Sequence, residues 1–141
     1  MTKLQKRAIR SIGGKDTKTH TDPLFKKYKL LKFEDIIEYN KLSIAHTIFY
    51  NYAPTALKEH IKREIPHPRL RRNTDNLQID GSNIKSISRY QIPFSWNKLD
   101  SETKDITSKS KFKSAIKKSF FQKYSNLDIC NVINCRTCNN S

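Results

Sequence analysis

The 141-residue chain has few acidic residues and no long apolar run. Only 13 Asp and Glu accompany 28 Lys and Arg, which gives a net charge of +15 and an isoelectric point near 9.9. No stretch approaches the roughly 18 consecutive apolar residues of a membrane-spanning helix. The first residues also lack the apolar segment of a secretory signal. We therefore expect a protein that is neither secreted nor inserted in a membrane.

Cysteine is scarce and confined to the carboxy-terminal end, at Cys130, Cys135 and Cys138. An odd, clustered set is not typical of a disulfide framework, so we expect a reducing compartment, nuclear or cytoplasmic. The spacing C-x4-C-x2-C contains a C-x2-C pair, which is half of a common zinc site. A distant histidine, His60 or His67, would have to supply a fourth ligand. Zinc at the cysteine tail and ordinary free thiols both stay open.

The positive charge points to a partner that carries phosphate. Each phosphate neutralised by Lys or Arg releases condensed counterions, so basic proteins bind RNA and DNA readily. A membrane surface would favour a single strongly basic amphipathic helix, whereas these cations are spread along the chain. Solubility alone is the remaining reading. Since hydrophobic residues make up 35% of the chain and the mean hydropathy is −0.77, we expect a modest core beneath a charged surface.

Helical periodicity predicts a mainly α fold. Residues 3–12 form a short helix with Leu4, Ala8 and Ile12 on its apolar face, ended by Gly13-Gly14. The strongest helix is expected over residues 33–52, before Pro54, with His46 on its polar edge at the surface. Its core stripe comprises Phe33, Ile36, Ile37, Ile44, Ile48 and Tyr52, flanked by Ala45 and Phe49.

Shorter elements are expected between and after these helices. Asp22-Pro23 is a helix start with Asp as N-cap, and residues 55–64 favour another helix. Residues 77–79 and 84–91, separated by Asp80-Gly81, predict a short hairpin. Trp96 is expected to anchor this second part. A basic closing helix over residues 108–124 has an apolar face of Phe112, Ala115, Ile116, Phe120 and Tyr124.

Two groups of cations are candidate nucleic-acid contacts, and the alternative for both is an ordinary solvated helix face. The first group lies on residues 3–12 and the second on the closing helix, which has no acid between Asp105 and Asp128. Both would bind by charge and groove shape, without an obvious set of base-reading side chains. The candidates are Lys3, Lys6, Arg7, Arg10, Lys113, Lys117 and Lys118.

Several segments, in order, resemble the region that follows the palm in reverse transcriptases of non-LTR (LINE-type, jockey-like) retrotransposons. Residues 4–10 read LQKRAIR, residues 20–25 read HTDPLF, and residues 30–36 are similar to that family's ILKLxDL. Residues 71–77 resemble NTRSxDNL, residues 86–99 resemble SIRYxGPxxWNxL, and residues 112–124 resemble a closing FKxxLKxxLLxxY helix. Ile92 stands where the family has glycine. The resemblance spans residues 4–124.

This resemblance implies a carboxy-terminal fragment of an RNA-directed DNA polymerase. It implies a thumb-like helical region over residues 1–65, a small α+β post-thumb region over 66–125, and a cysteine-containing tail over 126–141. The expected partners are RNA, DNA or an RNA–DNA hybrid, together with the missing palm and fingers. Because the palm aspartates that hold magnesium are absent, the fragment is expected to be non-catalytic. A domesticated basic nucleic-acid-binding protein and a non-functional retrotransposon relic are the alternatives.

Overall fold

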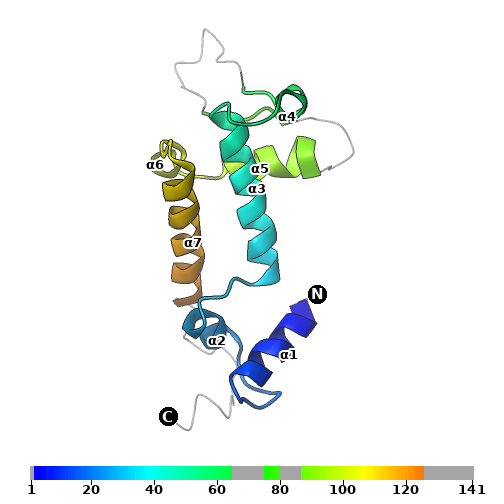
Figure 1. Ribbon diagram of the computed structural model, residues 1–141, viewed down its shortest axis with the longest axis vertical. Helices are drawn as coiled ribbons and strands as arrows, with labels where there is room; N and C mark the ends of the chain where they lie inside the picture. The colour runs from blue at the N-terminus through cyan, green and yellow to red at the C-terminus, as the bar shows by residue number, and fades with distance from the viewer. Residues whose placement is uncertain (1, 65–74, 80–86, 126–141) are drawn as a thin grey trace. The chain divides into compact units, whose positions relative to one another are not determined.

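The computed structural model describes residues 2–64, 75–79 and 87–125, and over these the fold is mainly α, as predicted (Figure 1). No helix in these ranges is both long and apolar enough to cross a membrane. The elements are α1 (Thr2–Ile12), α2 (Asp22–Lys27), α3 (Phe33–Phe49), α4 (Thr55–His60), the π-helical turn η1 (Ile87–Gln91), α5 (Ile92–Asn97), α6 (Ser101–Lys104) and α7 (Lys109–Ser125).

The chain divides into two compact units. Unit 1 comprises residues 1–37 and 116–141, and unit 2 comprises residues 38–115. Helices α3 and α7 each contribute residues to both units. The family-based division at residues 65 and 125 stays a prediction, and the cysteine tail lies outside the described residues.

The core of unit 1 brings together α1, α2 and the end of α7. Its buried residues are Ile9, Leu24, Phe25 and Tyr124, with Tyr28 and Phe121 packed against them. Helix α1 ends at the predicted glycines: the Gly13 amide donates to the Ile9 carbonyl at 3.0 Å, and Gly14 has φ +57°. Glycine adopts that left-handed backbone without steric cost, so the chain can reverse into the loop before α2.

The predicted apolar face of α1 is wrong. Leu4 and Ile12 are 64% and 65% exposed and Ala8 is exposed, whereas Ile9 is 2% exposed. The i, i+4, i+8 spacing identified residues that share one face of the helix. The side chains of α2 instead pack on the Ile9 side, and burial follows that contact.

Helix α3 ends three residues before the predicted end. Asn51 has φ +61°, and the Tyr52 amide donates to the Thr47 carbonyl at 2.8 Å, which closes the last turn. Only part of the predicted stripe is core: Ala45, Ile48 and Phe49 are buried, together with Leu42. The prediction is wrong for Ile36, Ile37, Ile44 and Tyr52, which are 37%, 44%, 39% and 64% exposed.

Trp96 anchors unit 2, as predicted. Its side chain is fully buried. The centre of its ring lies 4.8 Å from the ring centre of Phe49 and 5.9 Å from that of Phe112. Its indole N–H donates to the Asp75 carbonyl at 2.9 Å. The neighbouring Asn97 side chain makes two 2.9 Å hydrogen bonds with the backbone of Leu77. These bonds hold residues 75–79 against α5.

The predicted hairpin is wrong for residues 87–91, which form η1 and continue directly into α5. Leu77 pairs instead with Arg63 in an isolated antiparallel bridge. Residues 84–86 lie outside the described residues. Ile92 is 4% exposed and helical, so this position needs no glycine. Apolar and polar residues alternate only imperfectly over residues 87–91, which is a weak strand signal. Ile92-Pro93 is a stronger signal for a helix start, because Pro is favoured in the first turn of a helix.

Candidate nucleic-acid interface

The cations predicted on α1 do not share one environment. Lys3, Lys6 and Arg7 are exposed, whereas Arg10 is half-buried and its Nε donates to the Thr19 carbonyl at 2.7 Å. Arg10 therefore ties the loop after α1 to the helix. Its guanidinium has further N–H groups that can still reach a phosphate.

A shallow cleft lies beside the last turns of α1. It is lined by Arg7, Arg10, Ser11, Lys15 and Thr17. Three cations with two hydroxyl groups form a suitable cradle for a phosphate, because hydroxyl and guanidinium groups both donate to its oxygens. Sequence reasoning missed Lys15. The reversal at Gly13-Gly14 was the available signal that the chain returns toward α1.

The cations predicted on α7 fall in both units. Lys117 and Lys118 are exposed and belong to unit 1, whereas Lys113 is half-buried and belongs to unit 2. The first turn of α7 has no acid and instead carries Lys109 and Lys111. Cations there oppose the helix dipole, so this arrangement stabilises the helix only when an anion is close.

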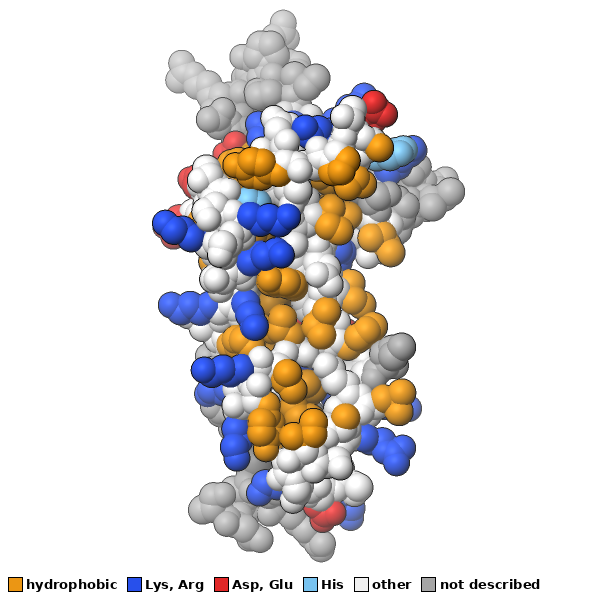
Figure 2. Space-filling model, in the orientation of Figure 1, with side chains coloured by type: hydrophobic (Ala, Val, Ile, Leu, Met, Phe, Trp, Pro, Cys, Tyr) orange, Lys and Arg blue, Asp and Glu red, His pale blue; other side chains and the backbone are white. Residues whose placement is uncertain are grey.

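Among the described residues, net positive charge is concentrated in unit 1. The described part of this unit has four acids, Asp16, Asp22, Glu34 and Asp35. It has thirteen basic side chains, namely Lys3, Lys6, Arg7, Arg10, Lys15, Lys18, Lys26, Lys27, Lys29, Lys32, Lys117, Lys118 and Lys123. Figure 2 shows one face of the molecule, where blue basic side chains outnumber red acidic ones.

The described part of unit 2 is closer to neutral. Its seven acids are Glu38, Glu59, Glu64, Asp75, Asp100, Glu102 and Asp105. Its ten basic side chains are Lys41, Lys58, Lys62, Arg63, Arg89, Lys98, Lys104, Lys109, Lys111 and Lys113. Over the described residues, the net positive charge is therefore larger in unit 1 than in unit 2.

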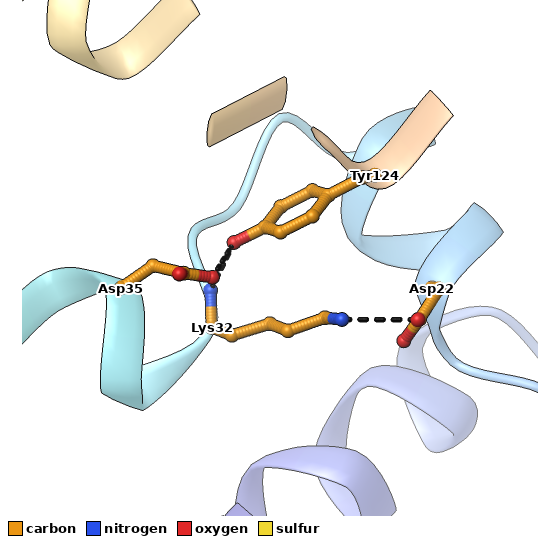
Figure 3. A network of polar contacts seen from close by, with 4 residues as sticks. All are labelled: Asp22, Lys32, Asp35 and Tyr124. Carbon is orange, nitrogen blue, oxygen red and sulfur yellow. Dashed lines mark hydrogen bonds and ion pairs between the residues drawn. The ribbon is translucent and has the colours of Figure 1, made fainter. Parts of the chain in front are cut away.

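Two acids of unit 1 are engaged in a structural network that joins α2, α3 and α7 (Figure 3). Lys32 forms a 3.0 Å ion pair with Asp22, and its ammonium lies 4.7 Å from the centre of the Tyr124 ring. The Tyr124 hydroxyl accepts the Lys32 amide at 3.0 Å and donates to the Asp35 carboxylate. Burial, helped by the bond to Asp35, raises the pKa of Tyr124. Because Asp22 is paired with Lys32, its negative charge does little to neutralise the exposed cations of unit 1.

His46 is not at the surface, so that prediction is wrong. Its side chain is fully buried, stacked 4.4 Å from the Phe112 ring centre, and its Nε2 lies 2.8 Å from the Ile106 carbonyl oxygen. Burial lowers the pKa of His46, which holds the ring neutral and lets Nε2–H donate. Its role is structural, because an aromatic ring with one donor fits the space between α3 and α7.

Lys104 is another polar group that sequence reasoning did not place. It is 7% exposed, and its ammonium donates to the Asn76 side-chain oxygen at 3.0 Å. Burial lowers the pKa of Lys104. This lysine holds residues 75–79 and is withdrawn from any phosphate contact.

The proposed zinc ligands Cys130, Cys135 and Cys138 lie outside the described residues, as does His67. Within the described ranges, no group of three His, Cys, Asp or Glu residues could hold a metal ion. His60 lines an open polar pocket of unit 2, where its Nδ1 lies 3.4 Å from an Arg89 nitrogen. Zinc binding stays a prediction.

The described surface can bind anions through exposed cations at α1, at the loop after it and at the unit 1 end of α7. Comparison of the chain with protein-family models, with curated proteins and with solved structures finds no match.

Proposed function

We propose that this chain is a non-catalytic carboxy-terminal part of a retrotransposon reverse transcriptase, and that it binds template–primer nucleic acid through α1 and α7. The observation that carries the binding proposal is the excess of thirteen basic over four acidic side chains among the described residues of unit 1. A surface charged only for solubility would not need to place cations unevenly. The family assignment rests on the resemblance of residues 4–124 alone.

The binding mode we propose is contact with phosphate. Lys3, Lys6 and Arg7 follow one helix surface, and Lys117 and Lys118 extend from the end of another in the same unit. Long, exposed cations of this kind contact the backbone of a duplex whatever its sequence. A template–primer hybrid is recognised mainly through its A-like geometry and backbone, which such contacts suit.

The missing palm and fingers are the proposed protein partner. Leu4, Ala8 and Ile12 are exposed on α1 in a row one turn apart. An apolar row beside cations is typical of a surface that packs on another domain. We propose that this face of α1 contacts the palm in the complete polymerase.

A titration of the purified chain against an RNA–DNA hybrid duplex at several salt concentrations tests the binding proposal. The logarithm of the affinity should fall linearly with the logarithm of the salt concentration. Replacing Lys3, Lys6 and Arg7 together by Gln should reduce the magnitude of that slope by about one for each phosphate contact removed, about three in all.

Lys58, Lys62 and Lys98 provide the matched control. These lysines belong to unit 2 and lie outside α1 and α7, and replacing all three by Gln removes the same formal charge. The control variant should keep most of the slope. Equal slopes for the two triple variants would show that only net charge matters, and a wild-type chain that does not bind at low salt would refute the proposal.

The family part of the proposal has a separate test. Sequencing the transcript upstream of Met1 should reveal an in-frame palm with a Tyr-x-Asp-Asp motif. An unrelated reading frame there would favour a domesticated binding protein instead.

A further inference from the structure

A second concave site of unit 1 lies where the end of α2 meets the end of α7. It is lined by Lys26, Lys29, Lys118, Phe121 and Gln122. Three of these lining residues are cations and none is acidic. The site is therefore an apolar surface formed by an aromatic ring and the stems of three lysines, and neither candidate group from the sequence contained Lys26 or Lys29.

The aromatic ring in this site is held in place. Phe121 is half-buried and packs against the core, and its ring meets that of Tyr124 edge to face at 5.9 Å and 81°. Tyr124 is itself fixed by its bonds to Lys32 and Asp35. A ring fixed from beneath and accessible in part is ready to stack with a flat ligand, because little side-chain freedom remains to be lost.

The lysines at the rim come from different parts of the chain. Lys118 precedes Phe121 by three residues on α7, so both lie on the same face of the helix. Lys26 lies in the last turn of α2, and Lys29 follows that helix. The ammonium of Lys117 also lies 5.9 Å from the Phe121 ring centre. Phosphate groups on either side of a stacked ring would meet cations.

Lys29 has a backbone conformation that is unusual for a residue with a side chain. It has φ +51°, and the following Leu30 amide donates to the Phe25 carbonyl at 3.0 Å, as at a helix end that reverses direction. Glycine is the favoured residue at this left-handed position, and a lysine there is strained. Strained residues concentrate at functional sites, and Lys29 lines this one.

We infer that this site binds one unpaired nucleotide of a single-stranded RNA or DNA, with its base stacked on Phe121 and its phosphates contacting Lys26, Lys29 and Lys118. The Gln122 amide can donate to or accept from a base edge. Base stacking on aromatic side chains tolerates any sequence. The inference rests on the proposed function because it assumes a nucleic-acid partner, and it adds a single-strand site to the duplex-binding surface.

The experiment compares two fluorescent oligonucleotides of equal length bound to the full chain. One is an oligothymidylate, and the other has the same phosphates but abasic sugars. The chain should bind the thymidylate about tenfold more tightly, since stacking on one aromatic ring contributes to affinity only when a base is present. Phe121→Leu should abolish that preference, and Phe121→Trp should keep it and show fluorescence quenching by the thymidylate alone.

A second variant separates binding from folding. Lys29→Gly relieves the strained backbone, so it should keep or raise the melting temperature, yet weaken binding of both oligonucleotides severalfold. Equal affinity of the wild-type chain for the two oligonucleotides would overturn the inference. So would displacement of the thymidylate by poly-glutamate as readily as by unlabelled thymidylate, because that result would mean selection for charge alone.

The outcome is independent of the duplex titration. Salt-sensitive binding of the RNA–DNA hybrid without any base preference in single strands would leave the proposed function standing and remove this site. Loss of hybrid binding with a retained preference for the thymidylate would refute the proposed duplex binding and leave the single-strand site standing.

Discussion

Removing one oxygen atom from Tyr124 should destabilise unit 1 measurably. The side chain is 1% exposed, and its hydroxyl accepts the Lys32 amide and donates to the Asp35 carboxylate. Tyr124→Phe keeps the ring and its packing against Phe25 and its neighbours. The variant therefore isolates the two hydrogen bonds from the apolar contacts.

The expected loss of stability follows from the two hydrogen bonds that the Tyr124 hydroxyl makes. A hydrogen bond to a charged group contributes about 1.5–3 kcal/mol, and a neutral one about 1 kcal/mol. Lys32 and Asp35 are half-buried, so water can partly replace the lost hydroxyl. We therefore expect a loss of about 2–3 kcal/mol, near the lower end of the roughly 2.5–4 kcal/mol for the two bonds together.

The assay is urea denaturation followed by far-ultraviolet circular dichroism. With a slope of about 2 kcal/mol per molar urea, the midpoint of Tyr124→Phe should fall by about 1 M. Tyr52→Phe is the matched control because Tyr52 is 64% exposed. It should change the free energy of unfolding by no more than about 0.5 kcal/mol. A loss below that limit for Tyr124→Phe would refute the network as a source of stability.

The same hydroxyl predicts behaviour at alkaline pH. The pKa of Tyr124 is raised in the folded chain above its usual value of 10.0 because burial and the bond to Asp35 oppose ionisation. The unfolded chain therefore releases this proton first, and stability that is complete below pH 10.0 should decline as the pH rises above it. Tyr124→Phe should show a shallower decline, and an unchanged decline would contradict the assignment.

Three further predictions concern single side chains. Ile9→Ala should cost about 2–5 kcal/mol in urea denaturation because it empties a buried site, whereas Leu4→Ala should cost at most about 0.5 kcal/mol because Leu4 is exposed; a larger loss at Leu4 would mean that α1 packs by its other face. The pKa of His46 is lowered from 6.5 by burial, so stability should be complete above that pH and fall by up to about 1.4 kcal/mol per pH unit below it. His46→Gln should remove that component of the pH dependence, and an unaltered pH profile would refute it. Asp100 accepts the Thr103 amide at 2.8 Å as the N-cap of α6, so Asp100→Ala should lower stability by about 1 kcal/mol, and Asp100→Asn should retain most of it.

Local signals were enough to place most helices. The turn at Gly13-Gly14, the Asp22-Pro23 start and the periodicity before Pro54 each depend on residues within one or two turns of one another. For this reason α1, α3 and α7 lie close to their predicted ranges. Helix α2 begins at the predicted place, but its N-cap is Thr21 and the prediction of Asp22 as N-cap is wrong. The concentration of lysine and arginine was also visible without a structure, because charge is a property of composition.

Which face of each helix is buried depended on the tertiary structure. The α1 pattern indicated Leu4, Ala8 and Ile12, whereas the packing of α2 buries Ile9 instead. The burial of His46 on α3 is due to Phe112 and Ile106, which lie about sixty residues away in the sequence. Helical periodicity shows which residues share a face of a helix, whereas burial depends on which other elements pack against that face.

Some residues of the candidate sites could be identified from the sequence, and others only from the tertiary structure. The exposed cations Lys3, Lys6 and Arg7 needed only the sequence, because they follow one another along a single helix. Lys29 and Phe121 are more than ninety residues apart, and no local pattern relates a lysine after α2 to an aromatic ring at the end of α7. They line one site only in the folded chain, where the neighbouring Tyr124 makes long-range hydrogen bonds with Lys32 and Asp35.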